Sequence, residues 1–174
     1  MTDQSMPALV LRPLRPDDEA SFVAAHHAMA REGFSFGIAY DEGMLWADYL
    51  VLVRNMQAGR ELPGRFVAST FLLAELDGDI VGRTSVRHTL NDFLLHEGGH
   101  IGYCVLPPYR RRGYATTILQ RSLVLTRQLG VERALVTCND GNVGSVAVIV
   151  ACGGQLESTV DGADGNRKRR YWIG

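Results

Sequence analysis

The residues with the clearest potential for chemistry are three consecutive arginines, Arg110, Arg111 and Arg112, followed by Gly113 and Ala115. They lie where a strand pattern gives way to a helix pattern, so the positive charges stand at a helix N-terminus, where the helix dipole disfavours cations. An anion held among these charges and the free N–H groups of the first turn removes the conflict. Gly113 lets the backbone approach such a ligand closely. The pattern predicts a phosphate site, and the alternative is a solvated basic turn.

A second polar group follows a later apolar run. Asn139 and Asn142 stand between the predicted strand RALVTC and a helix of small residues that contains Ser145. Asparagine at the start of a helix is a natural N-cap, because its side-chain oxygen accepts a hydrogen bond from a free backbone N–H group. Capping alone explains these residues, and contact with a ligand remains open beside it.

Hydrophobic periodicity predicts the elements that position these residues. Helices are expected at about residues 17–33, 45–59, 115–129 and 142–152, and strands at 8–12, 70–76, 80–88, 100–105, 133–138, 155–160 and 169–173. Asp77-Gly78 is a strong hairpin turn between the second and third strands. The predicted order is therefore β-α-α-β-β-β-α-β-α-β-β.

The bulk composition is that of an ordinary globular protein. The chain has 174 residues, of which 46% are hydrophobic and 21% charged, and its net charge is −1. We expect one domain over residues 1–174, with no nucleic-acid or membrane partner, since neither a basic excess nor a long apolar run is present. The N-terminus lacks the pattern of a signal peptide. Three cysteines without metal-ligand spacing (Cys104, Cys138 and Cys152) indicate reduced, buried thiols in a cytoplasmic protein.

The chain resembles the GNAT superfamily of N-acetyltransferases. Arg110-x-x-Gly113-x-Ala115 matches the signature Q/R-x-x-G-x-G/A, and the element order is that of the family. The segments GRTSVRH, LNDFLL, GGHIGY and RRYWI are similar to a subgroup of uncharacterised predicted acetyltransferases. The resemblance covers nearly the whole chain. It implies an α+β fold with a mixed, mostly antiparallel sheet that splays open near its central strands.

The resemblance also implies a site for acetyl-CoA. Its pyrophosphate would be held by the arginine loop and the first helical turn, which comprise Arg110, Arg111, Arg112, Gly113, Tyr114, Ala115 and Thr116. In the family, a bulge in the central strand frees backbone N–H groups, so a bulge is expected around residues 103–105. Val105 would donate to the thioester oxygen, and Leu106 would be a further backbone position facing the cofactor. Asn142-x-x-Ser145 matches the family's contact with the CoA arm, and Asn139 would join it.

One position departs from the family. Many members carry a tyrosine seven residues after the asparagine that corresponds to Asn142, where it protonates the leaving thiolate. Here that position is Ile149, which cannot donate a proton. A thiol has a pKa of about 8.5, so a thiolate can also leave without an acid.

Candidate bases for the amine are two histidines. His100 occupies a strand position where some members of the family place a glutamate, and a symmetric connection would set His88 directly opposite it. Two adjacent imidazoles would hold one of them neutral near pH 7. A structural role is the alternative for both, Glu97 and Glu61 are further candidates, and a base acting through water would leave no mark. No established metal motif is present, so no metal is expected.

The sequence thus predicts an acetyl-CoA-dependent N-acetyltransferase that acts on a primary amine of a small molecule or peptide, by direct transfer in a ternary complex. The alternative is an acyl-CoA-binding sensor or regulatory module of the same fold, which the missing tyrosine favours. A nucleotide site is disfavoured because no P-loop or dinucleotide motif is present. The resemblance implies that the loop at residues 61–69 borders the acceptor. The last hairpin, with Tyr171 and Trp172, is a candidate homodimer contact.

Overall fold

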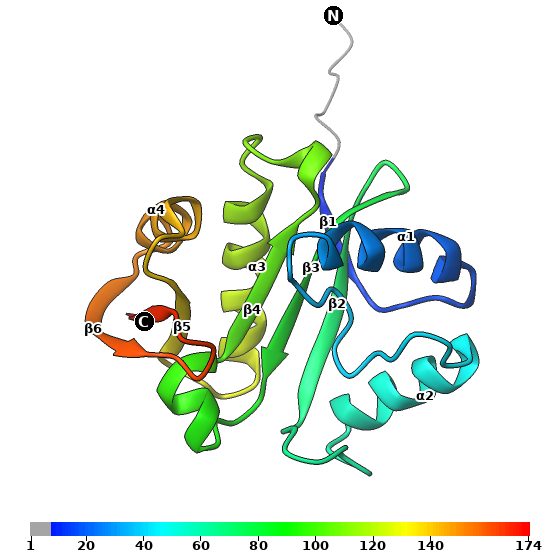
Figure 1. Ribbon diagram of the computed structural model, residues 1–174, viewed down its shortest axis with the longest axis horizontal. Helices are drawn as coiled ribbons and strands as arrows, with labels where there is room; N and C mark the ends of the chain where they lie inside the picture. The colour runs from blue at the N-terminus through cyan, green and yellow to red at the C-terminus, as the bar shows by residue number, and fades with distance from the viewer. Residues whose placement is uncertain (1–7) are drawn as a thin grey trace, which may run out of the picture.

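The computed structural model describes residues 8–174 (Figure 1), so the start of the chain on which the signal-peptide prediction rests lies outside the described residues. The predicted order of helices and strands is confirmed, with short helical turns added between them. The helices are α1 (Glu19–Ala30), α2 (Trp46–Gln57), α3 (Tyr114–Gln128) and α4 (Val143–Ala151). The strands are β1 (Val10–Arg12), β2 (Ser69–Leu76), β3 (Asp79–Arg87), β4 (Ile101–Val105), β5 (Ala134–Asn139), β6 (Gln155–Asp161) and β7 (Arg167–Ile173). The added turns are η1 (Pro16–Asp18), η2 (Leu94–Gly98) and η3 (Pro107–Tyr109).

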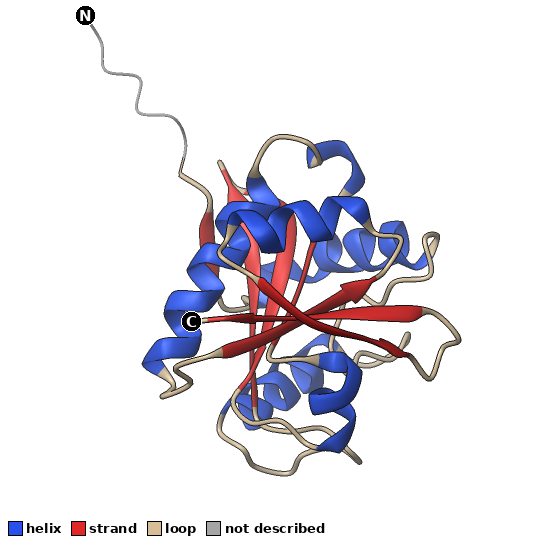
Figure 2. Cartoon of the chain, turned by 90° about the vertical axis from the view of Figure 1, so that its left-hand side faces the viewer, coloured by secondary structure: helices blue, strands red, loops and turns tan. Residues whose placement is uncertain are grey.

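The strands form two antiparallel sheets. The first has the order β1-β2-β3-β4 and the second the order β5-β7-β6. Figure 2 shows the strands of the second sheet running across those of the first. The helices α1 and α2 pack on one face of the four-stranded sheet, and α3 packs against β3 and β4 and also against α4. The expected splaying is confirmed, and it is complete enough to divide the strands into two sheets.

Among the described residues, backbone hydrogen bonding joins the two sheets at His100 and Leu135. The His100 N–H donates to the Leu135 carbonyl oxygen at 2.7 Å, and the Leu135 N–H donates to His100 Nδ1 at 2.9 Å. The preceding residue is Gly99, with φ of 67°, where a Cβ atom would lie 2.6 Å from the Leu135 carbonyl oxygen. Only glycine allows this close approach. Beyond the junction, β4 and β5 are not paired with one another.

The predicted bulge around residues 103–105 is wrong. The register between β3 and β4 is continuous, from Val86 opposite Ile101 to Gly82 opposite Val105. The backbones are close here, since a Cβ atom on Gly82 would lie 2.2 Å from the Cys104 carbonyl oxygen. A bulge is not needed to expose backbone groups, because the splaying of β5 already leaves one edge of β4 open.

The apolar core lies on both faces of the first sheet. Aromatic side chains fill the layer under α1 and α2, among them Phe22, Phe36, Trp46, Tyr49 and Phe71. A second cluster joins α3, α4 and the second sheet, and it includes Tyr171, which is only 2% exposed. Tyr171 is therefore a core residue, so the idea that it forms a dimer contact is not supported. No helix in residues 8–174 has the length and apolar character needed to cross a membrane.

Candidate active site

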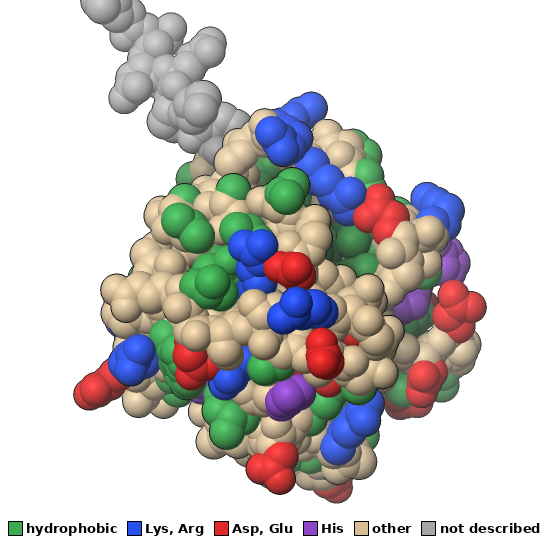
Figure 3. Space-filling model, turned by 60° about the vertical axis from the view of Figure 1, so that its left-hand side comes forward, with side chains coloured by type: hydrophobic (Ala, Val, Ile, Leu, Met, Phe, Trp, Pro, Cys, Tyr) green, Lys and Arg blue, Asp and Glu red, His purple; other side chains and the backbone are tan. Residues whose placement is uncertain are grey.

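A groove of about 740 Å³ opens where the two sheets separate. Its walls come from the end of β4, the N-termini of α3 and α4, the end of β5 and the end of α1 with the residues that follow it. Figure 3 shows basic side chains along the upper rim of a hollow on this face. The groove brings together most of the predicted cofactor residues, namely Val105, Arg110, Arg111, Gly113, Tyr114, Ala115, Thr116, Asn139, Asn142 and Ser145.

The pairing of β4 determines which of its backbone groups face the groove. The Arg87 N–H donates to the His100 carbonyl at 2.8 Å, and the Leu106 N–H donates to the Val81 carbonyl at 2.8 Å. Backbone groups alternate in direction along a strand, so even-numbered residues face β3 and Val105 faces the open side. The Val105 N–H is thereby directed toward the groove. The N–H of Leu106 is already used in the sheet, so the prediction that it faces the cofactor is wrong.

The arginine loop has an unusual backbone. Arg111 has φ of 63° and Gly113 has φ of 82°, both in the left-handed region. For arginine this conformation costs about 1 kcal/mol or more, and such strain tends to occur at functional sites. The Thr117 N–H donates to the Gly113 carbonyl at 3.2 Å, which leaves the earlier N–H groups of α3 unused by the helix. These free N–H groups lie at the rim of the groove, where they are suited to bind an anion.

The three arginines do not share one role. The Arg110 guanidinium donates to the Val105 carbonyl at 3.0 Å and to the Glu32 carboxylate at 2.6 and 3.1 Å, so it ties the end of β4 to the end of α1. Arg111 and Arg112 are exposed, and of these two only Arg111 lines the groove. Arg110 lines the groove, and a ligand contact there would compete with these exposed bonds, so its binding to the cofactor stays a prediction.

The two asparagines have structural partners. Asn142 caps α4, because its Oδ1 accepts a hydrogen bond from the Ser145 N–H at 3.0 Å. Asn139 Oδ1 accepts from Lys168 Nζ at 2.6 Å. Both residues nevertheless line the groove. The capping interpretation therefore holds, and ligand contact remains compatible with it.

Ile149 is fully buried in the core and does not line the groove. The groove instead contains tyrosines from other elements, Tyr103, Tyr109 and Tyr114. Tyr103 has a buried hydroxyl that lies beside the Ser145 side chain without a hydrogen bond of good geometry among residues 8–174, and burial raises its pKa to about 12. Sequence reasoning missed Tyr103 and Tyr109. Their signal was available in the alternation of β4, which places side chains of residues 101, 103 and 105 on one face.

The predicted pairing of His88 with His100 is wrong. The residue opposite His100 is Arg87, and a slip of one residue puts His88 on the other face of the sheet. The connection is asymmetric because residues 94–98 form a π-helical turn. His88 Nε2 instead contacts Thr70 Oγ1 at 2.9 Å, and His100 accepts from Leu135. Neither histidine lines the groove, and neither do Glu61 and Glu97.

The junction at His100 leads to a prediction for pH. Burial, and then the charge of Arg87, lower the pKa of His100, so the folded state favours the neutral ring that accepts from Leu135. The unfolded chain then binds the proton more readily, and stability present above pH of about 6.5 is lost as the pH falls through the native pKa. In His100→Asn the amide oxygen replaces Nδ1 and does not titrate in this range.

Urea unfolding at pH 7.5, 6.5 and 5.5 measures this effect. The wild type should lose more stability over this interval than His100→Asn does. Equal losses in the two proteins would show that His100 does not titrate differently on folding. His26 and His88 also have lowered pKa values but are common to both proteins, so the difference isolates His100.

No group of three or more His, Cys, Asp or Glu side chains within residues 8–174 is placed to hold a metal ion. The groove is instead lined by backbone N–H groups, hydroxyls, amides and one strained arginine loop. Such donors suit an extended ligand with phosphate at one end and a polarisable carbonyl near Val105.

Comparison with known proteins identifies the family. The family profile for an acetyltransferase (GNAT) domain matches residues 8–155. The chain belongs to the GNAT acetyltransferase family. None of the curated proteins compared with it gives a match.

Solved structures of the same fold have low sequence identity to the chain. RimJ from Mycobacterium smegmatis in complex with CoA-disulfide has a TM-score of 0.68 and 21% identity, covering 95% of this chain and 81% of that one. A GNAT-family acetyltransferase from Streptococcus pneumoniae gives 0.65 and 18%, covering 95% and 98%. The structure of yncA from Salmonella typhimurium with acetyl-CoA gives 0.64 and 15%, covering 95% and 93%. At these identities the likeness concerns the fold.

Proposed function

We propose that the protein transfers the acetyl group of acetyl-CoA to a primary amine, by direct transfer in a ternary complex. The observation that carries the proposal is the groove between the sheets, with the strained arginine loop at its rim and the open edge of β4 along its wall. Its volume of about 740 Å³ is typical of a ligand site. Membership of the family, and the acetyl-CoA and CoA-disulfide bound in yncA and RimJ, support this choice of ligand.

The residues present fit acetyl-CoA, which would supply an activated acetyl thioester. The N–H groups at the start of α3 bind its phosphates, with Arg111 adding charge. Gly113 faces open space, where a Cβ atom would meet nothing within 4 Å, so ligand atoms have room to approach. The Val105 N–H donates to the carbonyl oxygen and stabilises the negative charge that develops on it. The side chains of Asn139, Asn142 and Ser145 line the path of the pantetheine arm.

Tyr103 is the donor we assign to the leaving sulfur. Its hydroxyl lies beside the Ser145 side chain, and no contact among residues 8–174 has the geometry of a hydrogen bond to it, so it can turn to donate to the sulfur. With a pKa of about 12, compared with about 8.5 for a thiol, it retains its proton and stabilises the thiolate without transferring the proton fully. The proton lost by the amine passes to water, since neither candidate histidine lines the groove.

A cytoplasmic location remains part of the proposal. All three cysteines are free thiols, and Cys104 is buried while Cys138 and Cys152 are half-buried, so the expectation of full burial holds only for the first. Free thiols are usual where the compartment is reducing.

The test is release of free CoA thiol in the presence of a panel of primary amines, with mass measurement of the acetylated product. The proposal predicts thiol release that depends on the amine. Binding of acetyl-CoA without transfer to any amine would contradict it and favour the sensor module, whose sequence support is the absence of a tyrosine at Ile149.

A further inference from the structure

A second, separate hollow lies on the face of the sheet that carries α1 and α2. It is a cavity of about 150 Å³ between the loop before β2, the end of β3 and the segment that leads into η2. Its walls are largely apolar, formed by Ile38, Phe66, Val67, Phe93 and Leu94. Its polar residues are Arg65, Ser69, Arg87 and Asn91. A volume of this size holds a small organic group, and residues 65–67 of the loop before β2 form part of its wall.

Arg87 is a cation without an anion. Arg87 Nη1 donates weak hydrogen bonds to two carbonyl oxygens, those of Gly98 at 3.3 Å and Gly99 at 3.5 Å. No carboxylate within residues 8–174 forms an ion pair with Arg87. Burial, and then the charge of Arg83, lower the pKa of Arg87 to about 10, so it remains charged at neutral pH. Of its five N–H donors most are left for another partner. Arg87 is half-buried, and a partly desolvated charge without a counter-ion is stabilised when an anionic ligand compensates it.

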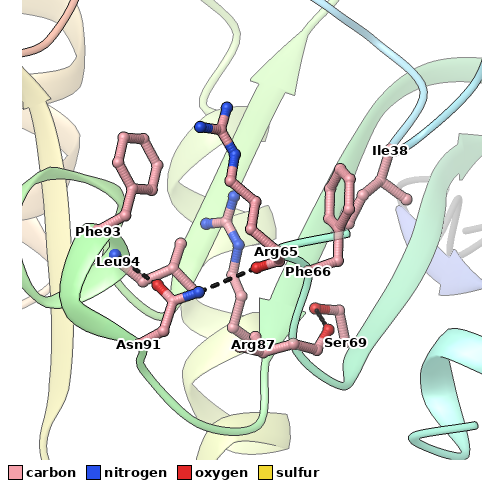
Figure 4. A pocket seen from close by; sticks show the side chains of 9 residues that line it. Ile38, Arg65, Phe66, Ser69, Arg87, Asn91, Phe93 and Leu94 are labelled. Atoms are coloured by element: carbon pink, nitrogen blue, oxygen red, sulfur yellow. Dashed lines mark hydrogen bonds between the residues drawn. The ribbon is translucent and has the colours of Figure 1, made fainter. Parts of the chain in front are cut away.

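Arg65 adds a second guanidinium to the same cavity. Its guanidinium lies 5.3 Å from the centre of the Phe93 ring, and it too has no carboxylate partner in the described part of the chain. Figure 4 shows the side chains of Arg65 and Arg87 extending in the same direction. Asn91 holds the two walls together, because its Nδ2 donates to the Arg65 carbonyl at 3.0 Å and its Oδ1 accepts from the Leu94 N–H at 3.0 Å. The cavity is therefore preorganised.

An unpartnered hydroxyl lies beside these charges. Ser85 is 1% exposed, and its Oγ has no hydrogen-bond partner among residues 8–174. It lies between Arg83 and Arg87 on the same face of β3, two residues from each. This part of the β3 face therefore carries two guanidinium groups and a hydroxyl without a hydrogen-bond partner, and no carboxylate among the described residues pairs with either guanidinium.

The cavity also has a defined position relative to the proposed thioester site. The Arg87 guanidinium lies over Gly102, where a Cβ atom would be 3.1 Å from its Nη1. Val105 is three residues further along the same strand, which corresponds to about 10 Å. An extended tripeptide spans a similar length.

We propose that this cavity binds a carboxylate of the acceptor, so that the substrate class is a primary amine joined to a carboxylate about a tripeptide's length away, such as a short peptide with a free C-terminus. This proposal rests on the proposed function. A half-buried and an exposed guanidinium beside apolar walls form charge-assisted hydrogen bonds with a carboxylate and repel a polyamine. The apolar walls accept the side chain or the aliphatic part next to that carboxylate.

The probes are tri-alanine and its C-terminal amide, which share the amine and differ in the carboxylate. Binding is measured by titration calorimetry in the presence of saturating acetyl-CoA, and acetylation by thiol release. The variants are Arg87→Lys and Arg65→Gln, and the control is Arg60→Gln, an exposed arginine outside the cavity. Arg65 is exposed as well, so its variant remains informative if replacement of Arg87 prevents folding.

The expected result is that the wild type and Arg60→Gln bind the acid about tenfold to a hundredfold more tightly than the amide. Arg65→Gln and Arg87→Lys should reduce this preference while their affinity for acetyl-CoA is unchanged. Equal binding of acid and amide, or no binding of either, would overturn the carboxylate site even if acetyl-CoA binds and other amines are acetylated. Failure of acetyl-CoA to bind would instead contradict the proposed function.

Discussion

Replacing Arg83 with methionine should destabilise the protein by about 3 kcal/mol or more, because three backbone carbonyls would lose their donor. The Arg83 guanidinium donates to the carbonyls of Phe36 at 2.9 Å, Gly102 at 2.9 Å and Ser35 at 3.0 Å. It also packs 4.9 Å from the centre of the Phe34 ring. The side chain is only 7% exposed, so water would not readily replace these bonds.

The loss of Arg83 should also disturb both the groove and the cavity. Arg83 fastens the residues after α1 to β3 and β4, and this segment lines the groove through Phe34 and the cavity through Ile38. Urea unfolding gives the change in free energy. Arg121→Met, at an exposed position of α3, is the control and should change stability by less than about 0.5 kcal/mol. A loss for Arg83→Met no larger than that of the control would contradict the assigned role.

Gly113→Glu should abolish the stabilisation of the protein by acetyl-CoA. A ligand that binds only the native state stabilises it by about 2.7 kcal/mol at a hundred times its Kd, which raises the Tm of the wild type. The new carboxylate would stand at the N–H groups proposed to hold the phosphates and would repel them. It would also place a side chain at a φ of 82°, which costs about 1 kcal/mol in any protein.

Gly165→Glu is the matched control. Gly165 has φ of 80°, and like Gly113 it has nothing within 4 Å of an added Cβ atom, but it lies in the turn between β6 and β7. Both variants should lower the Tm of the free protein by similar amounts. Only Gly113→Glu should lose the rise with acetyl-CoA. A full rise in Gly113→Glu would place the phosphates elsewhere.

Local sequence signals were sufficient for the order of the elements. Asp77-Gly78 predicted a hairpin, and both residues have positive φ values of 52° and 89°. Gly113 and Ala115 marked the start of α3, and Asn142 marked the start of α4. Each of these features depends on a few neighbouring residues, and such information is contained in a short stretch of sequence.

Features that depend on long-range pairing could not be predicted as well. The one-residue difference in register that separates His88 from His100 arises from the π-helical turn at residues 94–98. The partner of Arg110, Glu32, lies 78 residues away. The cavity around Arg87 combines residues from segments near positions 38, 65, 87 and 93. The interpretation of this cavity as an anion site depends on the absence of a carboxylate near Arg87 among the described residues. The sequence alone does not show which carboxylates lie near Arg87.

The central claim, that the groove between β4 and β5 binds acetyl-CoA, is tested most directly by amide hydrogen exchange with and without the ligand. The N–H groups of residues 111–116, in the arginine loop and the first turn of α3, are not bonded within the helix, so they should exchange quickly in the free protein. The account predicts that acetyl-CoA slows exchange in these residues and at Val105, with little change in α2. Binding that leaves residues 111–116 and Val105 unprotected would contradict it.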